Sequence, residues 1–503
     1  MRTSILGSFA AVGAAVAVVL PAQAAAAAPP SVGPLALASG PSPFAGCTGG
    51  LDPGSPPGTN NVNAEVEPNV AVDPARPSHL IAVFQQDRWS NGGARGLVTA
   101  ISSNGGTTWT EPSPPHFSKC AGGTAANGGA YDRASDPWVS IGPDGRAYQV
   151  SLSVNAAQTT SAILASTSTN DGATWSEPVT VQRDDSPNRF VFNDKESVTA
   201  DPHKAGTAYV VWDRSRFPSD KAGVNAGHSS AFRGDPMFSK TTDGGQTWST
   251  PTRISPQNNN MFTIGNQIAV LPDGTLVDVF HYGKGSGKDQ PNASLTGVAR
   301  STDGGKTWSK PIQISNNPVV NDVDPDTGFP LRTGADIGGG LPDIAVDPSS
   351  GDLYVVWEDS RFTGTHNDIA MSKSTDGGLT WSAPKKVNQT PTPVGAFTPM
   401  VDVLADGTLA VTYYDIRNNT ADPNRLDTDY FVAVSHNGGS SWQESRITPA
   451  SFDDTTAPVS RGYFLGDYEG LADNGTAFKS FFVQTNSGNT NNRTDAFATT
   501  ITP

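Results

Sequence analysis

Residues 301–308 read STDGGKTW and residues 374–381 read STDGGLTW, two almost identical octapeptides whose starts lie 73 residues apart. The same pattern, Ser/Thr-x-Asp/Asn-x-Gly-x-Thr/Ser-Trp, occurs six times, at intervals of 66, 73, 60, 73 and 61 residues. Self-similarity at such a period is typical of repeat architectures. The six copies span 102–109, 168–175, 241–248, 301–308, 374–381 and 435–442.

The residue types in this octapeptide are those of a tight turn between two strands. Asp or Asn accepts hydrogen bonds from amides of its own turn, and Gly adopts the positive φ that strains other residues. The Trp that closes each copy offers a large ring for burial between repeats. We therefore interpret these aspartates as structural.

A second recurrent feature, an apolar strand, a DG or DP turn and another apolar strand, precedes each octapeptide. Residues 268–280, IAVLPDGTLVDVF, are one example. Such alternation predicts antiparallel hairpins. Seven such units are found, and the last has no octapeptide; they lie near Glu67, Asp136, Glu196, Gln267, Asp343, Thr398 and Tyr468.

Together these repeats predict an all-β chain with a single β-propeller of four-stranded antiparallel blades over residues 61–503. Seven blades are favoured, and six remain open if the first and last units share one blade. The composition agrees, because 53 Gly, 40 Pro and only 16% charged residues indicate a turn-rich, helix-poor chain. A net charge of −15 argues against nucleic acid or an anionic membrane as partner.

The N-terminus has the pattern of a secretory signal peptide over residues 1–24: Arg2, an apolar stretch and a small-x-small cleavage site. The alternative, a membrane anchor, would need a longer apolar run. Residues 25–60 are predicted to be a flexible N-terminal segment. The mature chain is expected to be secreted and extracellular, with a disulfide between Cys47 and Cys120; the alternative is two unpaired buried thiols.

The octapeptides at this spacing resemble the Asp-boxes of the sialidase superfamily, also called BNR-repeat proteins. The resemblance covers most of the mature chain and implies a propeller that acts on or binds glycans. Family sialidases have six blades and carry an early Phe/Tyr-Arg-Ile-Pro motif, which this sequence lacks. Asp-box propellers also include lyases and non-catalytic binding proteins, so the resemblance leaves the function open.

Four predicted hairpin ends carry an Asp near an Arg after an apolar or aromatic strand. One interpretation is that the arginines hold the carboxylate of an acidic sugar, because a guanidinium binds a carboxylate bidentately. The other is that each Arg braces its own blade through the neighbouring Asp. The candidates are Arg88, Arg214, Arg361 and Arg417.

Sialidase-like catalysis would need a nucleophilic Tyr, a carboxylate base and a separate acid. The resemblance suggests Tyr468 as the nucleophile, with Glu196 as its base partner and Asp87 as the acid. Asp136 and Asp343 begin inner strands and are assigned to the same substrate pocket. The alternative for each is a polar group that lines the channel without a catalytic role.

The leading hypothesis is a secreted, exo-acting, sialidase-like glycoside hydrolase that recognises an acidic sugar on an extracellular glycan, without a cofactor and as a monomer. One alternative is a non-catalytic propeller that binds glycan or protein. Another is a lyase acting on uronic-acid polysaccharides, with the pair His281 and Tyr282 supplying the catalytic base. The loop with Asp322, Asp324 and Asp326 is a weak calcium candidate, and an ordinary acidic turn is the alternative.

Overall fold

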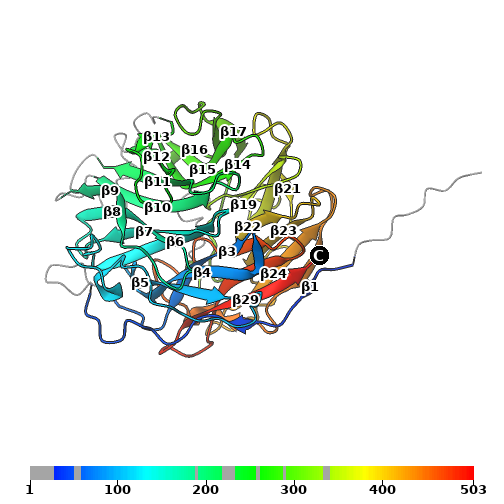
Figure 1. The fold of residues 1–503 in the computed structure, drawn as a ribbon. Helices are drawn as coiled ribbons and strands as arrows, with labels where there is room; N and C mark the ends of the chain where they lie inside the picture. Colours follow the sequence, from blue (N-terminus) through cyan, green and yellow to red (C-terminus); the bar gives the residue numbers. More distant parts are fainter. Residues whose placement is uncertain are drawn as a thin grey trace, which may run out of the picture.

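The computed structural model describes residues 28–49, 58–186, 191–217, 233–255, 261–286, 290–331 and 340–503. These residues form antiparallel sheets and no α-helix, which confirms the all-β prediction (Figure 1). The described part of the chain contains no helix with the length and apolar character needed to cross a membrane. The predicted signal peptide, residues 1–24, lies outside the described residues.

The described strands pair as seven successive antiparallel units, numbered here in chain order. Unit 1 holds β3 (Glu65–Asp73), β4 (Arg76–Arg88) and β5 (Ala94–Ser102); unit 2 holds β6 (Arg133–Ile141), β7 (Ala147–Val154), β8 (Thr160–Ser168) and β9 (Val179–Asp185). Unit 3 holds β10 (Val191–Ala200), β11 (Ala208–Arg216), β12 (Arg233–Thr241) and β13 (Thr252–Arg253); unit 4 holds β14 (Met261–Val270), β15 (Leu276–Ser286), β16 (Gln290–Ser301) and β17 (Ile312–Asn316).

The remaining units follow the same order along the chain. Unit 5 holds β18 (Asp343–Val346), β19 (Leu353–Asp359), β20 (Asp368–Ser374) and β21 (Lys385–Lys386); unit 6 holds β22 (Ala396–Val403), β23 (Leu409–Asp415), β24 (Asp427–Ser435) and β25 (Gln443–Arg446), with β26 (Phe452–Asp453) beside β24. Unit 7 holds β27 (Gly470–Asp473), β28 (Phe478–Thr485) and β29 (Thr494–Thr502).

The N-terminal segment completes the last unit. We expected residues 25–60 to be a flexible lead-in, but β1 (Ser31–Val32) and β2 (Ala36–Leu37) pair with β29. Pairing satisfies backbone groups that would otherwise be exposed at the edge of unit 7. Figure 1 shows this blue N-terminal stretch beside the red C-terminal strands.

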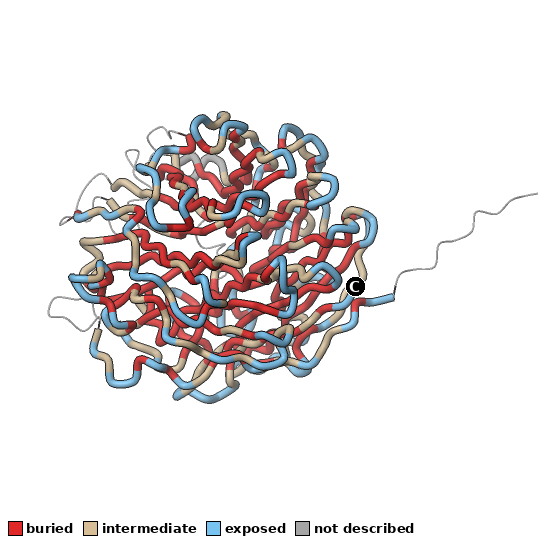
Figure 2. The backbone as a smooth tube through the Cα atoms, in the orientation of Figure 1, coloured by how far each residue is buried: buried red, intermediate tan, exposed pale blue. Residues whose placement is uncertain are grey.

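The units are arranged in a propeller-like way around their first strands. Each first strand contacts the first strand of the next unit, and β27 of unit 7 contacts β3 of unit 1. Most apolar clusters combine side chains of two neighbouring units; for example, Phe84 of unit 1 stacks on Phe481 of unit 7 with ring centroids 6.3 Å apart. Figure 2 shows the strands buried and the connecting turns exposed.

The six octapeptides form the predicted turns. In the fourth copy the Asp303 carboxylate accepts the Thr307 amide at 2.9 Å, and the equivalent bond is present in the other five. Each Trp is partly buried, and Trp308 packs edge-on against Phe238 of the preceding unit at 5.4 Å. The octapeptides therefore serve packing between units.

Replacement of Gly305 by Ala should destabilise the protein more than the same change at Gly475. Both glycines have positive φ, +84° and +88°, but a Cβ at Gly305 would lie 2.3 Å from the Phe238 ring, whereas a Cβ at Gly475 meets nothing within 4 Å. The backbone strain is common to both variants and cancels in the comparison. The clash should lower the free energy of unfolding of the Gly305 variant by about a further 1–3 kcal/mol. Urea unfolding of both variants measures this difference, and equal midpoints would contradict the packing role.

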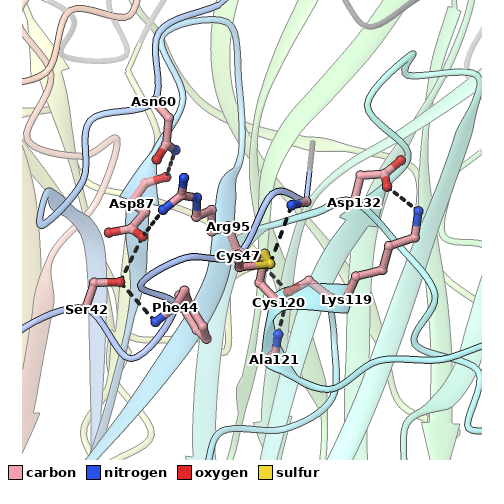
Figure 3. The surroundings of a disulfide bond; sticks show 12 residues. Ser42, Phe44, Cys47, Asn60, Asp87, Arg95, Lys119, Cys120, Ala121 and Asp132 are labelled. Carbon is pink, nitrogen blue, oxygen red and sulfur yellow. Dashed lines mark hydrogen bonds and ion pairs between the residues drawn. A yellow bond between two sulfur atoms is a disulfide. The ribbon is translucent and has the colours of Figure 1, made fainter. Parts of the chain in front are cut away.

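The predicted disulfide is present: Cys47 is bonded to Cys120 across 73 residues of chain. It ties the N-terminal segment to the connection between units 1 and 2, where Cys120 lies within the short 3₁₀ helix η1 (Lys119–Ala121) (Figure 3). Because disulfides persist in oxidising compartments, this bond is consistent with an extracellular protein.

Candidate functional site

A β-bulge recurs at the start of the first strand in units 1, 2, 3, 4 and 6. Bulges turn individual side chains out of the ladder and are frequent beside active sites. At this bulge one residue has a positive φ, and only unit 4 uses Gly there. Such strained non-glycine positions point to a functional constraint. The residues are Glu67 (54°), Asp136 (51°), Lys195 (44°), Gly265 (77°) and Thr398 (52°).

Three of these bulge residues, Glu67, Asp136 and Lys195, line one pocket of about 290 Å³, the central pocket. The β4–β5 turn forms one wall with residues 90–93, and Ser460, Arg461 and Asp467, which precede β27, form another. The central pocket thus collects side chains from several units where their first strands begin.

The lining of the central pocket is strongly charged. Its carboxylates are Glu67, Asp136, Asp194 and Asp467, and its cations are Arg88, Lys195 and Arg461. These groups come from units 1, 2, 3 and 7, and Arg461 itself has a positive φ of 69°. Convergent charged groups in a concave site are the usual mark of a binding or catalytic centre.

Lys195 is a deeply buried cation of the central pocket, with 4% of its surface exposed. Its Nζ lies 3.8 Å from the ring centroid of Tyr468 and 4.4 Å from that of Trp138. These cation–π contacts partly replace water around the ammonium. Nζ has no hydrogen-bond partner among the described residues.

Arg88, predicted as a carboxylate-binding residue, does line the central pocket. Its guanidinium donates to Gln85 Oε1 at 2.6 Å and lies 4.8 Å from the ring centroid of Phe464. The Gln85 amide in turn donates to Glu67. Gln85 therefore connects a cation and a carboxylate of the same pocket.

Tyr468 and Glu196, the predicted nucleophile and base, are buried and do not line the central pocket. The Tyr468 hydroxyl donates to the Pro137 carbonyl at 3.3 Å, and neither carboxylate oxygen of Glu196 has a hydrogen-bond partner in the described part of the chain. Burial raises the pKa of both groups well above its usual range, and nearby carboxylates add to the effect. Burial therefore favours the protonated, neutral form of both side chains.

Asp87, the predicted acid, lies in the structural network beside the disulfide (Figure 3). Its carboxylate accepts the Ser42 hydroxyl at 2.8 Å and the Asn63 amide at 2.9 Å, and it pairs with Arg95 at 3.2 Å. A fully buried carboxylate needs such donors. The structure thus places Asp87 where it anchors the N-terminal segment, outside the lining of the central pocket.

The other three candidate arginines also lie outside this lining and are paired. Arg214 donates to Asp184 of unit 2 at 2.8 Å, and Arg361 pairs with Asp359 at 2.7 Å. Arg417 bonds to Asp415 and Glu444 and lies 3.8 Å from the Phe431 ring centroid.

The expected pairing of Arg214 with Asp213 does not form. Asp213 accepts the Thr263 hydroxyl at 2.6 Å and the Asn266 amide at 2.7 Å instead, and burial raises its pKa to about 8. Asp213 thus joins unit 3 to unit 4, and Arg214 is left to bind Asp184.

Asp136 and Asp343 were expected in one pocket, but the structure separates them. Asp136 lines the central pocket, whereas Asp343 lines a smaller pocket of about 210 Å³ together with Asn69, Gln267 and Asp402. Asp343 accepts the Val401 amide at 2.7 Å, and burial raises its pKa to about 7.

The raised pKa of Asp343 makes a prediction for stability. The pKa of Asp343 in the folded protein lies above the unfolded value of about 3.9. The contribution of its protonated side chain to folding stability is therefore complete below pH 4 and is lost as the pH rises through 7. Asp343→Asn cannot ionise. The Tm of the variant minus the Tm of the wild type should therefore be larger at pH 8.5 than at pH 4.5, by about 2 °C or more. Thermal scans at both pH values measure the change, with Asp144→Asn, an exposed position, as control; a constant Tm difference would contradict the burial argument.

The pair proposed for a lyase, His281 and Tyr282, is buried in unit 4 and does not line the central pocket. Burial lowers the pKa of His281 to about 4, so its imidazole is neutral near pH 7.

In the acidic loop, the Asp324 carboxylate accepts the Asp326 amide at 2.9 Å and the Thr327 hydroxyl at 2.5 Å. Asp322 accepts the Asn367 amide at 2.7 Å. Within the described ranges no three acidic, His or Cys side chains are grouped to hold a metal ion. The geometry around Asp324 is that of an ordinary acidic turn.

The sequence interpretation missed several lining residues: Glu67, Asp194, Lys195, Arg461 and Asp467. Superposing the starts of the inner strands, EPN at Glu67, DPW at Asp136 and KES at Lys195, would have placed Glu67 and Lys195 at positions equivalent to Asp136. Arg461 and Asp467 lie in an irregular connection, where no periodic signal exists.

Parts of the chain match known proteins. Residues 237–335 match the model of the BNR repeat-like domain. A sialidase of Micromonospora viridifaciens is 27% identical over 216 residues, 40% of this chain and 30% of that protein. A sialidase of Bacteroides fragilis is 31% identical over 134 residues, 23% of this chain and 22% of that protein. These matches support a relationship of the chain to the sialidase superfamily of BNR-repeat proteins.

The similarity to individual proteins is partial. A xyloglucanase of a Paenibacillus species is 33% identical over 177 residues, 35% of this chain but 15% of that protein. The matches cover less than a third of each of these relatives. Among solved structures, an α-L-arabinofuranosidase of Fusarium graminearum covers 71% of this chain and 92% of its own, with 15% identity and a TM-score of 0.46.

Proposed function

We propose that the chain is a secreted glycoside hydrolase and that the central pocket is its active site. One observation carries this proposal: in a chain related to the sialidase superfamily, carboxylates and cations from four units converge in one pocket, several of them on strained bulges. Secretion is supported by the signal-like residues 1–24 and by the disulfide.

The proposal includes a seven-bladed propeller. Its support is the cycle of contacts between first strands, from β3 through every unit to β27 and back to β3. The pairing of β1 and β2 with β29 gives unit 7 its outer strand. Loops at one face of such a ring gather side chains from several blades.

The chemistry is assigned to the carboxylates that line the pocket. Glycoside hydrolysis needs one carboxylic acid to protonate the leaving oxygen and a second carboxylate as base or nucleophile. Glu67, Asp136, Asp194 and Asp467 offer several such pairs. Tyr468 and Glu196 lie buried beside them, and we assign these two to shaping the pocket floor.

Lys195 is the proposed anchor for an acidic sugar. A buried ammonium whose Nζ lacks a hydrogen-bond acceptor would gain from a ligand carboxylate. Arg88 and Arg461 supply further positive charge in the same pocket. These three residues take the role first expected for Arg214, Arg361 and Arg417.

A substrate panel tests the proposed activity. Fluorogenic sialoside and glucuronide, xyloglucan and uronic-acid polysaccharides are incubated with wild type and Tyr468→Phe. We expect hydrolysis of an acidic substrate, new reducing ends without an ultraviolet-absorbing product, and retained activity in Tyr468→Phe. An unsaturated, ultraviolet-absorbing product would show a lyase, turnover lost in Tyr468→Phe would return the nucleophile role to Tyr468, and glycan binding without turnover would show a binding protein.

A further inference from the structure

An exposed apolar surface lies beside the central pocket. Three of the six large apolar side chains exposed in the described part of the chain belong to it: Val323 (40%), Phe329 (37%) and Val459 (42%). The ring of Tyr463, half-buried, lies 4.6 Å from that of Phe329. We call these four residues the apolar ridge.

The apolar ridge is held by backbone pairing between two distant segments. Leu331 pairs with Tyr463, Val323 pairs with Pro330, and Val459 pairs with Tyr463. These bridges fix the exposed rings and methyl groups relative to one another. Exposed apolar groups that the fold holds in place beside a charged pocket mark an interaction site.

A second pocket, of about 380 Å³, adjoins the apolar ridge, because Val323 of the ridge lines it. Val323 and Leu331 belong to its wall, and Phe397 contributes an apolar surface. Its polar lining includes Asp322, Asp326, His366, Arg417 and Asn419. The second pocket therefore offers hydrogen-bond donors and acceptors around an apolar patch, as ligand sites do.

Residues of the three surfaces are neighbours in the chain or are paired by backbone bridges. Ser460 and Arg461 line the central pocket, their neighbours Val459 and Tyr463 belong to the ridge, and Leu331, the pairing partner of Tyr463, lines the second pocket. A ligand in the central pocket that continues past Arg461 therefore meets the ridge and then the second pocket.

We infer that the central pocket, the apolar ridge and the second pocket together bind a linear oligosaccharide. One end of the chain enters the central pocket, its middle sugars pack their C–H faces on Phe329 and Tyr463, and a further sugar enters the second pocket. This inference rests on the proposed function, since the central pocket is the proposed point of cleavage. A sugar chain fits because its hydroxyls need the polar groups of both pockets and its ring faces need an apolar platform between them.

The test measures how affinity depends on the length of the oligosaccharide, in the wild type and in a variant of the ridge. Binding of glucose and cello-oligosaccharides, and of galacturonic acid and oligogalacturonides, each series up to six sugars, is measured by calorimetry on wild type and Phe329→Ser. Leu379→Ser is the matched control, because Leu379 is also apolar and exposed (53%) but lies in the octapeptide turn of unit 5. Hydrolysis of the same sugars is followed in parallel.

We expect affinity in one series to rise with chain length, and Phe329→Ser to lower the affinity for the longest member about 3- to 10-fold. The monosaccharide should bind both proteins equally, and Leu379→Ser should match the wild type. A length-dependent loss without hydrolysis would support the ridge while the hydrolase proposal fails. Affinity independent of chain length, an equal loss for the monosaccharide, or no binding of either series would overturn the inference.

Discussion

Replacing Asp136 by Asn is expected to lower kcat about 10²- to 10⁴-fold, the usual effect of removing an acid or base group. Asp136 lines the central pocket from the bulge of unit 2, where its backbone has φ 51°. Asn tolerates this conformation and has the shape of Asp, so the fold should be unchanged. Steady-state kinetics on the best substrate of the panel measure the loss.

The control for Asp136→Asn is Asp144→Asn. Asp144 lies in the same unit, in the exposed turn after β6, and its nearest cation, Arg146, is 3.9 Å away. This variant should keep wild-type kcat and KM. If Asp136→Asn keeps activity within twofold while its Tm is unchanged, Asp136 takes no part in the reaction.

Removing the disulfide is expected to have the largest effect on stability. The double variant Cys47→Ala/Cys120→Ala opens a loop of 73 residues. In the chain-entropy model this costs about 4 kcal/mol, because the unfolded chain gains freedom. Hydrogen bonds from Ser42 and Asn63 to Asp87 still hold the N-terminal segment, so the variant should remain folded at low temperature.

Denaturant unfolding with and without dithiothreitol measures the contribution of the disulfide. The reductant should bring the wild type to the midpoint of the double variant and should leave the double variant unchanged. A double variant as stable as the oxidised wild type would show that the bond does not constrain the unfolded chain.

Local sequence signals predicted the local structure of this protein. The bond from the Thr307 amide to Asp303 depends on residues within one turn, and the Cys47–Cys120 bond involves the only two cysteines of the chain, so both could be predicted. The all-β class followed from the same turns. The pairing of Ser31 with Thr502 could not be predicted, because it joins the two ends of the chain and has no periodic signal.

The candidate site was harder to predict because its residues meet only in three dimensions. Lys195 directly precedes Glu196, the predicted base. The bulge turns Lys195 into the pocket and leaves Glu196 fully buried. Arg361 and Arg417 follow the same Asp-x-Arg pattern that suggested a ligand clamp, yet each guanidinium bonds to its own Asp. Which of two nearby residues faces a pocket depends on such bulges, and a single sequence does not reveal them.

The central claim is that the pocket lined by Glu67, Asp136 and Lys195 binds and cleaves a sugar. The most direct measurement is a crystal structure of Asp136→Asn with the best substrate of the panel. We expect a sugar ring in the central pocket, with a substrate oxygen within hydrogen-bond distance of Lys195 Nζ and the scissile oxygen beside residue 136. A substrate bound only elsewhere on the molecule, with the central pocket holding water, would contradict it.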